Sequence, residues 1–431
     1  MRVNGISNFD KRKTMKTRKI FAAALTVLIL AMSLSVRAQE NEEIQYRRSS
    51  IYTLLINHTE QDFGPVIRQA FLDLPVPDKY NNHNLSIRIV DMQEKLQDAK
   101  KDRENQAITD FLTENQIASR LVAKWFDRDF ETGACDMELI KERGLYNATE
   151  IDKAVAMKST RGKAMLEDAG EDLIGNTFVL VNDIRYVDKS EKSAVWGAIV
   201  NVVGAGLSIA GTLAGNSNLS STGDLVSTAG DMVETLKGFK VRINTFLYQL
   251  VWNDEVAGTF YSKWQAAGGP CDPFVFNNMR DKFTLKYVGK VESKGSTTSF
   301  MGVNLDQPIN MVRKACQRAL DENVVTLQRE FEAFRTKSPL ISDRPLRAYV
   351  GMKEGVTSDS RFEVLEAVED KNGKIRYEKV GEIKPKSDLI WDNRYMAVEE
   401  RAENATLGFT TFEKVKGGSF KKGMLIREIK H

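Results

Sequence analysis

The chain has 431 residues, of which 42% are hydrophobic and 9% aromatic, with 62 Lys and Arg residues against 59 Asp and Glu residues. This composition is typical of a globular protein of two or three domains, and with only three cysteines it excludes intrinsic disorder and a disulfide-rich scaffold. The first 38 residues hold eight basic residues and one acidic residue, a net charge of +7. Because the whole chain has a net charge of +3, residues 39–431 have a net charge of −4, and no clustered positive charge points to a nucleic-acid partner.

The first 38 residues have the three parts of an export signal. A basic segment, Met15–Lys19, precedes an uncharged apolar run, Ile20–Leu34, and the small residues Val36 and Ala38 stand before Gln39. The run of 15 residues is shorter than the roughly 20 needed to span a bilayer, so we predict a cleaved signal peptide and not an anchor. No cysteine follows the run, so we expect a periplasmic or outer-membrane-associated protein that is not a lipoprotein.

Residues 39–175 are predicted to form a mainly helical N-terminal region. A short apolar element covers Ser49–Asn57, the polar segment Asp78–Asn84 is predicted as a loop, and alternating apolar residues over 85–89 predict a strand. Hydrophobic residues recur at helical spacing in three segments: 63–71, 92–125 and 151–173.

Residues 176–338 are predicted to form an antiparallel sheet, an insert and a long helix. Three segments rich in β-branched and aromatic residues predict the strands: Phe178–Val187, Phe239–Asn253 and Phe283–Val291. A Gly-rich helical hairpin, 192–237, interrupts the first two strands. The long helix is predicted over 306–336, because an Asp and a Pro open it and Ser338-Pro339 closes it.

The Gly-rich insert is the most unusual segment of the sequence. Gly197, Gly204 and Gly211 repeat every seven residues within an uncharged stretch and so share one helical face, and Gly215 forms a small-xxx-small pair with Gly211. Such a face lets another helix approach closely, which predicts contact with a membrane, through 194–214, or with another subunit. The alternative is a hairpin packed inside the monomer, because interior glycines destabilise a helix by about 0.8–1 kcal/mol each relative to Ala.

The same insert does not predict a nucleotide site. After Gly204 and Gly206, Ile209 stands where a dinucleotide-binding motif needs its third glycine. The spacing from Gly206 to Gly211 lacks the following lysine that would contact phosphates. We therefore expect no cofactor.

Histidine and acidic side chains give no catalytic or metal motif. His58 or His83 would serve as a general base beside a serine, but no G-x-S-x-G or H-E-x-x-H motif is present, so an exposed or capping role is expected for both. Four acidic residues cluster in one predicted helix and are expected to form a solvated face: Glu167, Asp168, Glu171 and Asp172. No catalytic residue and no metal ligand is assigned.

The three cysteines are Cys135, Cys271 and Cys316, which allow at most one disulfide in an oxidising compartment. The sequence does not choose the pair. Cys316 lies on the apolar stripe of the predicted long helix, so we expect a buried structural thiol and not a nucleophile.

Residues 339–431 are predicted to form a small β-barrel or sandwich. Phe362 and Val364 alternate with polar residues, the segment Asp370–Gly373 turns the chain, and Ile375 and Tyr377 continue the alternation. Glycines recur between these short strands, as expected of turns.

Three motifs of this segment carry a resemblance: Gly351–Gly355 with its Gly-x3-Gly spacing, the strand Arg361–Leu365, and Val380–Ile383. Together they resemble small β-modules of accessory proteins in flagellar and curli-type secretion systems, over less than a quarter of the chain. The resemblance implies a β-module with a role in the cell envelope. The complete layout is similar to uncharacterised exported proteins of Bacteroidetes-type bacteria, which implies export and no particular activity.

We therefore expect an α+β protein of the cell envelope that acts in assembly or interaction and is not an enzyme. Its partner would be an envelope protein or a second copy of itself. The first alternative is a membrane-inserting or oligomerising component that acts through the Gly-rich hairpin. The second is an exported enzyme whose site is assembled from residues distant in sequence.

Export is directly testable. N-terminal sequencing of the protein recovered from the envelope should begin at Gln39 or within a few residues of it, because the small residues Val36 and Ala38 define the cleavage site. Recovery of a chain that still begins at Met15 would contradict the assignment of a cleaved signal.

Overall fold

The computed structural model describes residues 49–58, 60–99, 103–129, 131–133, 135–136, 138–146, 164–187, 239–265, 280–297, 308–369, 371 and 375–429. The predicted signal peptide, Cys271 and the Gly-rich hairpin 192–237 lie outside the described residues. The four glycines of the predicted contact face lie outside them too: Gly197, Gly204, Gly211 and Gly215.

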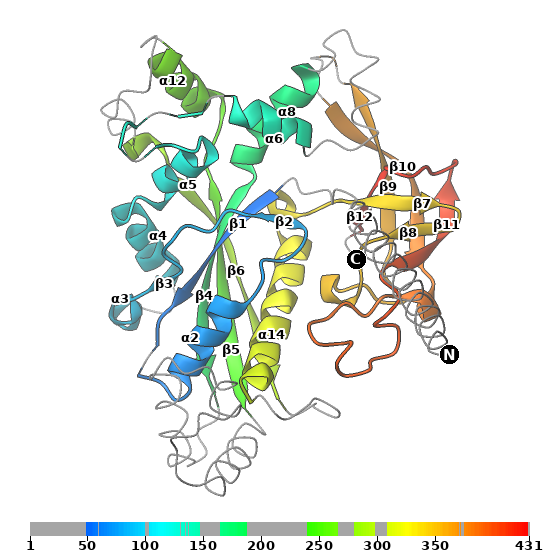
Figure 1. Ribbon diagram of the computed structural model, residues 1–431, viewed down its shortest axis with the longest axis horizontal. Coiled ribbons are helices and arrows are strands. Elements are labelled where there is room, and N and C mark those ends of the chain that lie inside the picture. The colour runs from blue at the N-terminus through cyan, green and yellow to red at the C-terminus, as the bar shows by residue number, and fades with distance from the viewer. Residues whose placement is uncertain are drawn as a thin grey trace, which may run out of the picture. The chain divides into compact units, whose positions relative to one another are not determined.

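Both helices and sheets are present, which confirms the α+β class (Figure 1). The α-helices of the described residues are α2 (Gly64–Asp73), α3 (Gln93–Asp98), α4 (Glu104–Glu114), α5 (Ile117–Trp125), α6 (Leu139–Tyr146), α8 (Ala164–Gly175), α12 (Asp254–Gln265) and α14 (Pro308–Glu330). The first sheet contains β1 (Ser49–Ile56), β2 (Tyr80–Asn82), β3 (Ile89–Val90), β4 (Thr177–Tyr186), β5 (Lys240–Leu250) and β6 (Leu285–Ser296). The second contains β7 (Ser338–Asp343), β8 (Leu346–Ala348), β9 (Phe362–Glu369), β10 (Ile375–Pro385), β11 (Thr410–Gly417) and β12 (Leu425–Glu428).

The first sheet is mixed, in the order β2-β1-β4-β5-β6, with β3 also paired to β1. The predicted antiparallel pairing is right for β4, β5 and β6. The sheet also contains β1, which the sequence predicted only as a short apolar element of the helical N-terminal region; β1 runs parallel to β4, with Leu55 opposite Asn182. Nearly every side chain of β1 is buried, as expected of a strand inside a sheet that is covered on both faces. A parallel pair needs a long crossover, and the helices between β1 and β4 provide it.

The segment that leads from α2 to α3 also differs from its prediction. The polar stretch Asp78–Asn84, expected to be a loop, contains β2, which pairs with β1 through Ser49 and Tyr80. The strand expected over 85–89 is reduced to the two residues of β3. Polar residues are tolerated in β2 because the strand lies at the edge of the sheet, where one side is open to solvent.

Helices cover both faces of the first sheet, with α3, α4 and α5 on one side and α2 and α14 on the other (Figure 1). The alternation within β5 explains this arrangement. Phe246 and Tyr248 pack against the first group of helices, whereas Val241 and Ile243 pack against α2 and α14.

The six strands of the second sheet pair in a closed ring, β10-β11-β8-β7-β12-β9, in which every pair is antiparallel. We call it the ring sheet. The strands predicted on either side of 370–373 pair as β9 and β10, with Glu369 opposite Ile375. Its interior is apolar and includes Val364, Ile383 and Phe412.

The long helix predicted over 306–336 is confirmed as α14, although it ends at Glu330 and Ser338 already belongs to β7. Among the described residues, no helix is both long enough and apolar enough to cross a membrane. Residues Tyr46–His431 group as one compact unit, and the domain boundaries predicted near 175 and 338 stay predictions.

The approach of α14 to the sheet generates a stability prediction. A Cβ atom at Gly295 of β6 would lie 2.3 Å from the carbonyl oxygen of Ala315 in α14, and this backbone atom cannot easily move away. We expect Gly295→Ala to lower the free energy of unfolding by about 1–3 kcal/mol through overpacking, measured by chemical denaturation.

The matched control is Gly258→Ala in α12, where an added Cβ would meet no atom within 4 Å. This variant should be as stable as the parent, or more stable by up to about 1 kcal/mol because Ala favours the helix. Equal stability of the Gly295→Ala variant and the parent would show that the helix and the sheet do not pack closely at Gly295.

Candidate functional site

A cleft of about 740 Å³ lies at one end of the first sheet, where α8, the end of β5 and α12 meet. It is far larger than two cavities beside α14, which measure about 40 Å³ each. Its size falls within the range of small-molecule sites. Its walls are formed by Glu171, Asp172, Gly175, Asn176, Gln249, Leu250, Val251, Trp252, Asn253, Asp254, Ala257, Tyr261 and Lys286.

Glu171 of α8 is the central polar group of the cleft. The indole Nε1 of Trp252 donates a hydrogen bond of 2.8 Å to its Oε2, and the Tyr261 hydroxyl donates to its Oε1. Burial, together with the neighbouring Glu171 carboxylate, raises the pKa of Tyr261, so this hydroxyl keeps its proton and stays a donor. The expectation that Glu171 belongs to a solvated acidic face is therefore wrong, whereas Asp172 is exposed.

Aromatic packing fixes the two rings that hold Glu171. Trp252 lies edge-on to Phe260 with ring centroids 5.5 Å apart, and parallel to Phe283 at 6.3 Å. Tyr261 also lies edge-on to Phe260, at 5.3 Å. Contacts of this kind contribute about 0.5–1.5 kcal/mol per pair beyond the burial of area. The hydrogen-bonded edges of Trp252 and Tyr261 are thus held in place before any ligand arrives.

The rim of the cleft is polar. Gln249 of β5 donates from Nε2 to the carbonyl oxygen of Gly175 at 2.8 Å, which fastens the end of α8 to the sheet. Asp172 and Asp254 add exposed carboxylates, and Lys286 of β6 is the one cation among the lining residues. The cleft therefore has an excess of negative charge and attracts cationic or hydrogen-bond-donating groups.

The histidines lie away from this cleft. His83 is 3% exposed, donates from Nε2 to the carbonyl oxygen of Leu121 at 3.0 Å, and stacks on Trp125 at a centroid distance of 4.8 Å. Burial lowers the pKa of His83 to about 3, so the ring is neutral. The expected exposed or capping role is wrong for His83, which is a core residue.

His58 forms a buried pair with Asp183 of β4. Its Nε2 lies 2.6 Å from Asp183 Oδ1, and Arg185 Nε donates to the same carboxylate at 2.9 Å. Burial alone would raise the pKa of Asp183, but the hydrogen bond from His58 and the charge of Arg185 outweigh burial and hold it below its usual value. An Asp–His pair supplies two of the three members of a hydrolytic triad, yet within the described chain no nucleophilic side chain bonds to His58.

The cysteine prediction is confirmed for Cys316, which is completely buried in α14. Burial raises the pKa of its thiol to about 12, so no thiolate forms near neutral pH. Cys135 is partly buried beside the aromatic core. Within the described ranges, no group of three or more His, Cys, Asp or Glu side chains is placed to hold a metal ion.

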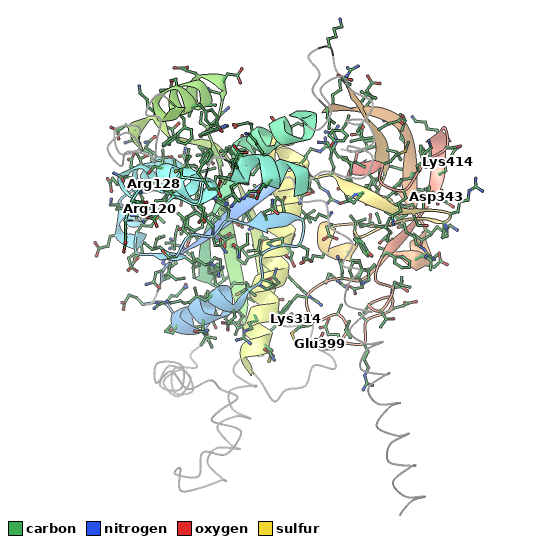
Figure 2. All side chains as sticks on the ribbon, turned by 45° about the horizontal axis from the view of Figure 1, so that its top comes forward. Arg120, Arg128, Lys314, Asp343, Glu399 and Lys414 are labelled. Carbon is green, nitrogen blue, oxygen red and sulfur yellow. The ribbon has the colours of Figure 1, made fainter. Side chains whose placement is uncertain are left out.

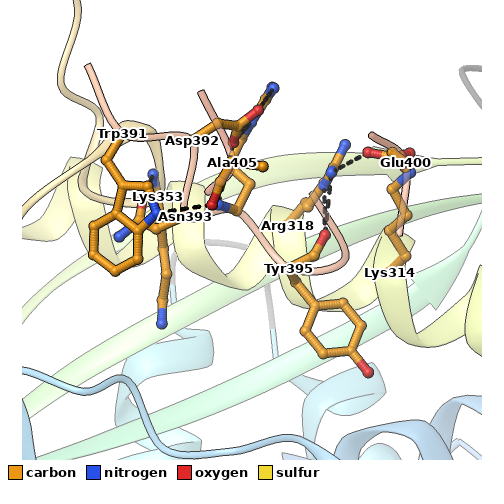
Figure 3. A network of polar contacts seen from close by, with 10 residues as sticks. Lys314, Arg318, Lys353, Trp391, Asp392, Asn393, Tyr395, Glu400 and Ala405 are labelled. Carbon is orange, nitrogen blue, oxygen red and sulfur yellow. Dashed lines mark hydrogen bonds and ion pairs between the residues drawn. The ribbon is translucent and has the colours of Figure 1, made fainter. Parts of the chain in front are cut away.

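A second polar cluster joins the ring sheet to α14 (Figure 3). Glu400 of the long loop 390–409 pairs with the buried Lys314, and Arg318 donates from Nη2 to Glu400 Oε2 at 2.6 Å and to the carbonyl oxygen of Tyr395 at 3.1 Å. Figure 2 labels Lys314 of α14 and Glu399, the residue that precedes Glu400 in the loop. Lys314 and Arg318 share the carboxylate of Glu400, so the cluster connects the loop that carries Glu400 to α14.

The cleft could not be predicted from the sequence, because its central residues are up to 90 positions apart and form no motif.

No known family model matches the sequence, and no curated protein is significantly similar to it. The function must therefore be inferred from the chemistry of the cleft. Both oxygens of Glu171 accept hydrogen bonds, so its carboxylate is held in one orientation in the wall of the cleft.

The buried His83 predicts a measurable pH dependence. Its folded-state pKa is about 3 against an ordinary 6.5, so between these values the unfolded chain binds a proton that the folded chain excludes. Stability therefore falls as the pH falls through this window. We expect His83→Gln, whose amide can also donate to Leu121, to lessen this fall by up to about 1.4 kcal/mol per pH unit, measured by denaturation at several pH values.

Gly258→Ala removes no titratable group and should keep the slope of the parent. An unchanged slope in the His83→Gln variant would mean that the folded protein protonates His83, against the neutral core role.

Proposed function

We propose that the protein is an exported cell-envelope protein that acts by binding a partner, and that the cleft around Glu171 is its binding site. One observation carries the proposal: Glu171 accepts hydrogen bonds from both Trp252 and Tyr261, so two aromatic side chains are oriented in advance along a wall of a large cleft. Preorganised walls lower the entropic cost of binding.

The chemistry of the walls favours a cationic group of the partner. Asp172 and Asp254 are exposed carboxylates, and aromatic rings attract cations through their faces. A lysine or arginine side chain of another polypeptide combines the positive charge with an apolar stem that suits Val251 and Ala257. A protein partner also agrees with the expected role in envelope assembly.

The ring sheet supports the same proposal from the other end of the chain. We propose that it is the small β-barrel expected from the sequence, similar to β-modules of secretion accessory proteins. Its closed strand order leaves no free sheet edge among its described strands. A module of this kind would present loops to the envelope, while the first sheet and its helices bind the partner.

The proposal is testable by photo-crosslinking at the cleft. A photoreactive amino acid that replaces Asp254 lies in the wall of the cleft. One that replaces Glu255, the next residue of α12, is also exposed but is not among the residues that line the cleft. In cells that produce the protein we expect a discrete protein adduct from position 254 and little or none from position 255.

Glu171→Gln should lower the adduct yield from position 254 several-fold, because an amide replaces the carboxylate that accepts from both rings. Equal adducts from positions 254 and 255, or no adduct from either, would contradict a protein-binding cleft.

A further inference from the structure

One of the two small cavities beside α14 lies between that helix, the end of α2 and the face of the first sheet. Residues of β1, β4 and β5 form its floor, among them Ile51, Leu180 and Thr245. The segment Pro75–Pro77, which follows α2 and is partly exposed, forms its outer wall. We call it the Asp321 cavity, after a lining residue of α14.

The walls of the Asp321 cavity are mostly apolar. Of its fifteen described lining residues, nine are Ile, Leu, Val, Phe or Pro, and only Arg88 and Asp321 are charged. Neither of these two forms an ion pair with a described residue, and because they form none with each other their charged atoms lie more than 4 Å apart. The cavity therefore brings together one cation and one anion that both lack a counter-ion, which is unfavourable away from water.

The wall at Asp321 is rich in acceptors. Asp321 is 7% exposed, and its Oδ1 accepts a hydrogen bond of 2.7 Å from Gln317 Nε2, whereas no described residue donates to its Oδ2. The neighbouring Oε1 of Gln317 is buried and also has no donor among the described residues. Buried acceptors without donors are rare in folded proteins, because the lost hydrogen bonds to water are not replaced. This wall therefore favours a positively charged donor, such as an ammonium group.

The wall at Arg88 offers a donor. Its Nη1 donates to the carbonyl oxygen of Leu72 at 3.1 Å and its Nη2 to Thr53 Oγ1 at 3.2 Å, and the guanidinium lies 4.9 Å from the ring centroid of Phe71. These contacts hold the guanidinium in place but supply no negative charge. Since a guanidinium carries five N–H groups and binds carboxylates especially well, this wall favours a carboxylate.

The two charges together select a ligand that carries both signs. A carboxylic acid alone would leave Asp321 without a counter-ion, and an amine alone would leave Arg88 without one. A metal ion would meet a single carboxylate in the described lining and would be repelled by Arg88.

The size of the Asp321 cavity restricts the ligand further. Its volume is about 40 Å³. A water molecule needs at least about 10–15 Å³ of such space, so the cavity has room for about three water molecules. A ligand of a few non-hydrogen atoms fits this space, and a larger one does not.

We propose that the Asp321 cavity binds a small zwitterionic α-amino acid, of the size of glycine or alanine. The ammonium group donates to Asp321 Oδ2, the carboxylate accepts from Arg88, and the α-carbon lies between the apolar walls. The cavity and the cleft around Glu171 share no lining residue, so this inference does not depend on the proposed function.

Equilibrium dialysis of the purified chain against radiolabelled glycine tests the proposal. Burial raises the pKa of Asp321 to about 7, so the dialysis is done at about pH 8, where the carboxylate is charged. We expect saturable binding of glycine that excess alanine abolishes and that excess leucine, acetate or ethylamine does not. Absence of binding would overturn the proposal. Competition by leucine, acetate or ethylamine as strong as that by alanine would also overturn it.

Variants locate the site. Asp321→Asn and Arg88→Gln each remove one charge and should weaken glycine binding at least about tenfold. The exposed residues Asp388 and Lys386 do not line the cavity, so Asp388→Asn and Lys386→Gln should bind as the parent does. Thermal unfolding verifies that each variant is folded, and the competition pattern of the parent chain tests the proposal even if one is not.

Unchanged binding in folded Asp321→Asn and Arg88→Gln variants would place the amino acid elsewhere and overturn the site. Glu171→Gln should lower the crosslinking yield at the cleft and leave glycine binding unchanged, so the two proposals can fail separately. Loss of glycine binding in the Glu171→Gln variant would assign the amino acid to the cleft and overturn the Asp321 cavity as its site.

Discussion

The packing of α14 across the first sheet is the contact on which the rest of the structure depends. Val312, Cys316 and Leu327 are completely buried on the side of the helix that faces the sheet. The helix also holds the ring sheet, through Lys314 and its neighbours. A helix that moved away from the sheet would therefore expose an apolar core and carry the ring sheet with it. The backbone of α14 can approach β6 this closely because residue 295 is a glycine, which has no side chain between the helix and the strand.

Polar groups inside this interface set the register of the helix. Asn323 donates to Thr245 Oγ1 at 2.8 Å, and Thr245 donates to Asn182 at 2.8 Å, so one chain of bonds joins α14, β5 and β4. Burial raises the pKa of Asp321 to about 7, although Lys353 acts in the opposite direction. The stabilisation that comes from a neutral Asp321 is fully present below pH 3.8, the ordinary pKa of this group, and is lost as the pH rises through 7. This trend opposes that of His83, so the two partly cancel in mild acid.

The elements that the sequence predicts well are those whose pattern is local. β4, β5, β6 and α14 are long and periodic, and the buried Cys316 follows from its place in an apolar stripe. The parallel pairing of β1 with β4 joins segments more than 120 residues apart, and no local pattern encodes it. The cleft depends in the same way on Glu171 and Tyr261, which are 90 positions apart in the sequence and are in contact in the folded chain. Asn182 and Asp183 were local signals of buried polar pairs, as polar residues within an apolar strand.

The attachment of the ring sheet rests on ion pairs of unequal strength. The pairs of Arg329 with Glu428 and of Arg427 with Glu332 have half-exposed partners, and exposed pairs of this kind contribute about 0.2–1 kcal/mol each. Lys314 is 2% exposed, and loss of the partner of a buried charge costs about 3–5 kcal/mol because the charge is left uncompensated. The pair of Glu400 with Lys314 therefore contributes more to the attachment of the ring sheet than the two exposed pairs combined. The long loop that carries Glu400 therefore fixes the ring sheet to the helix that also closes the sheet core.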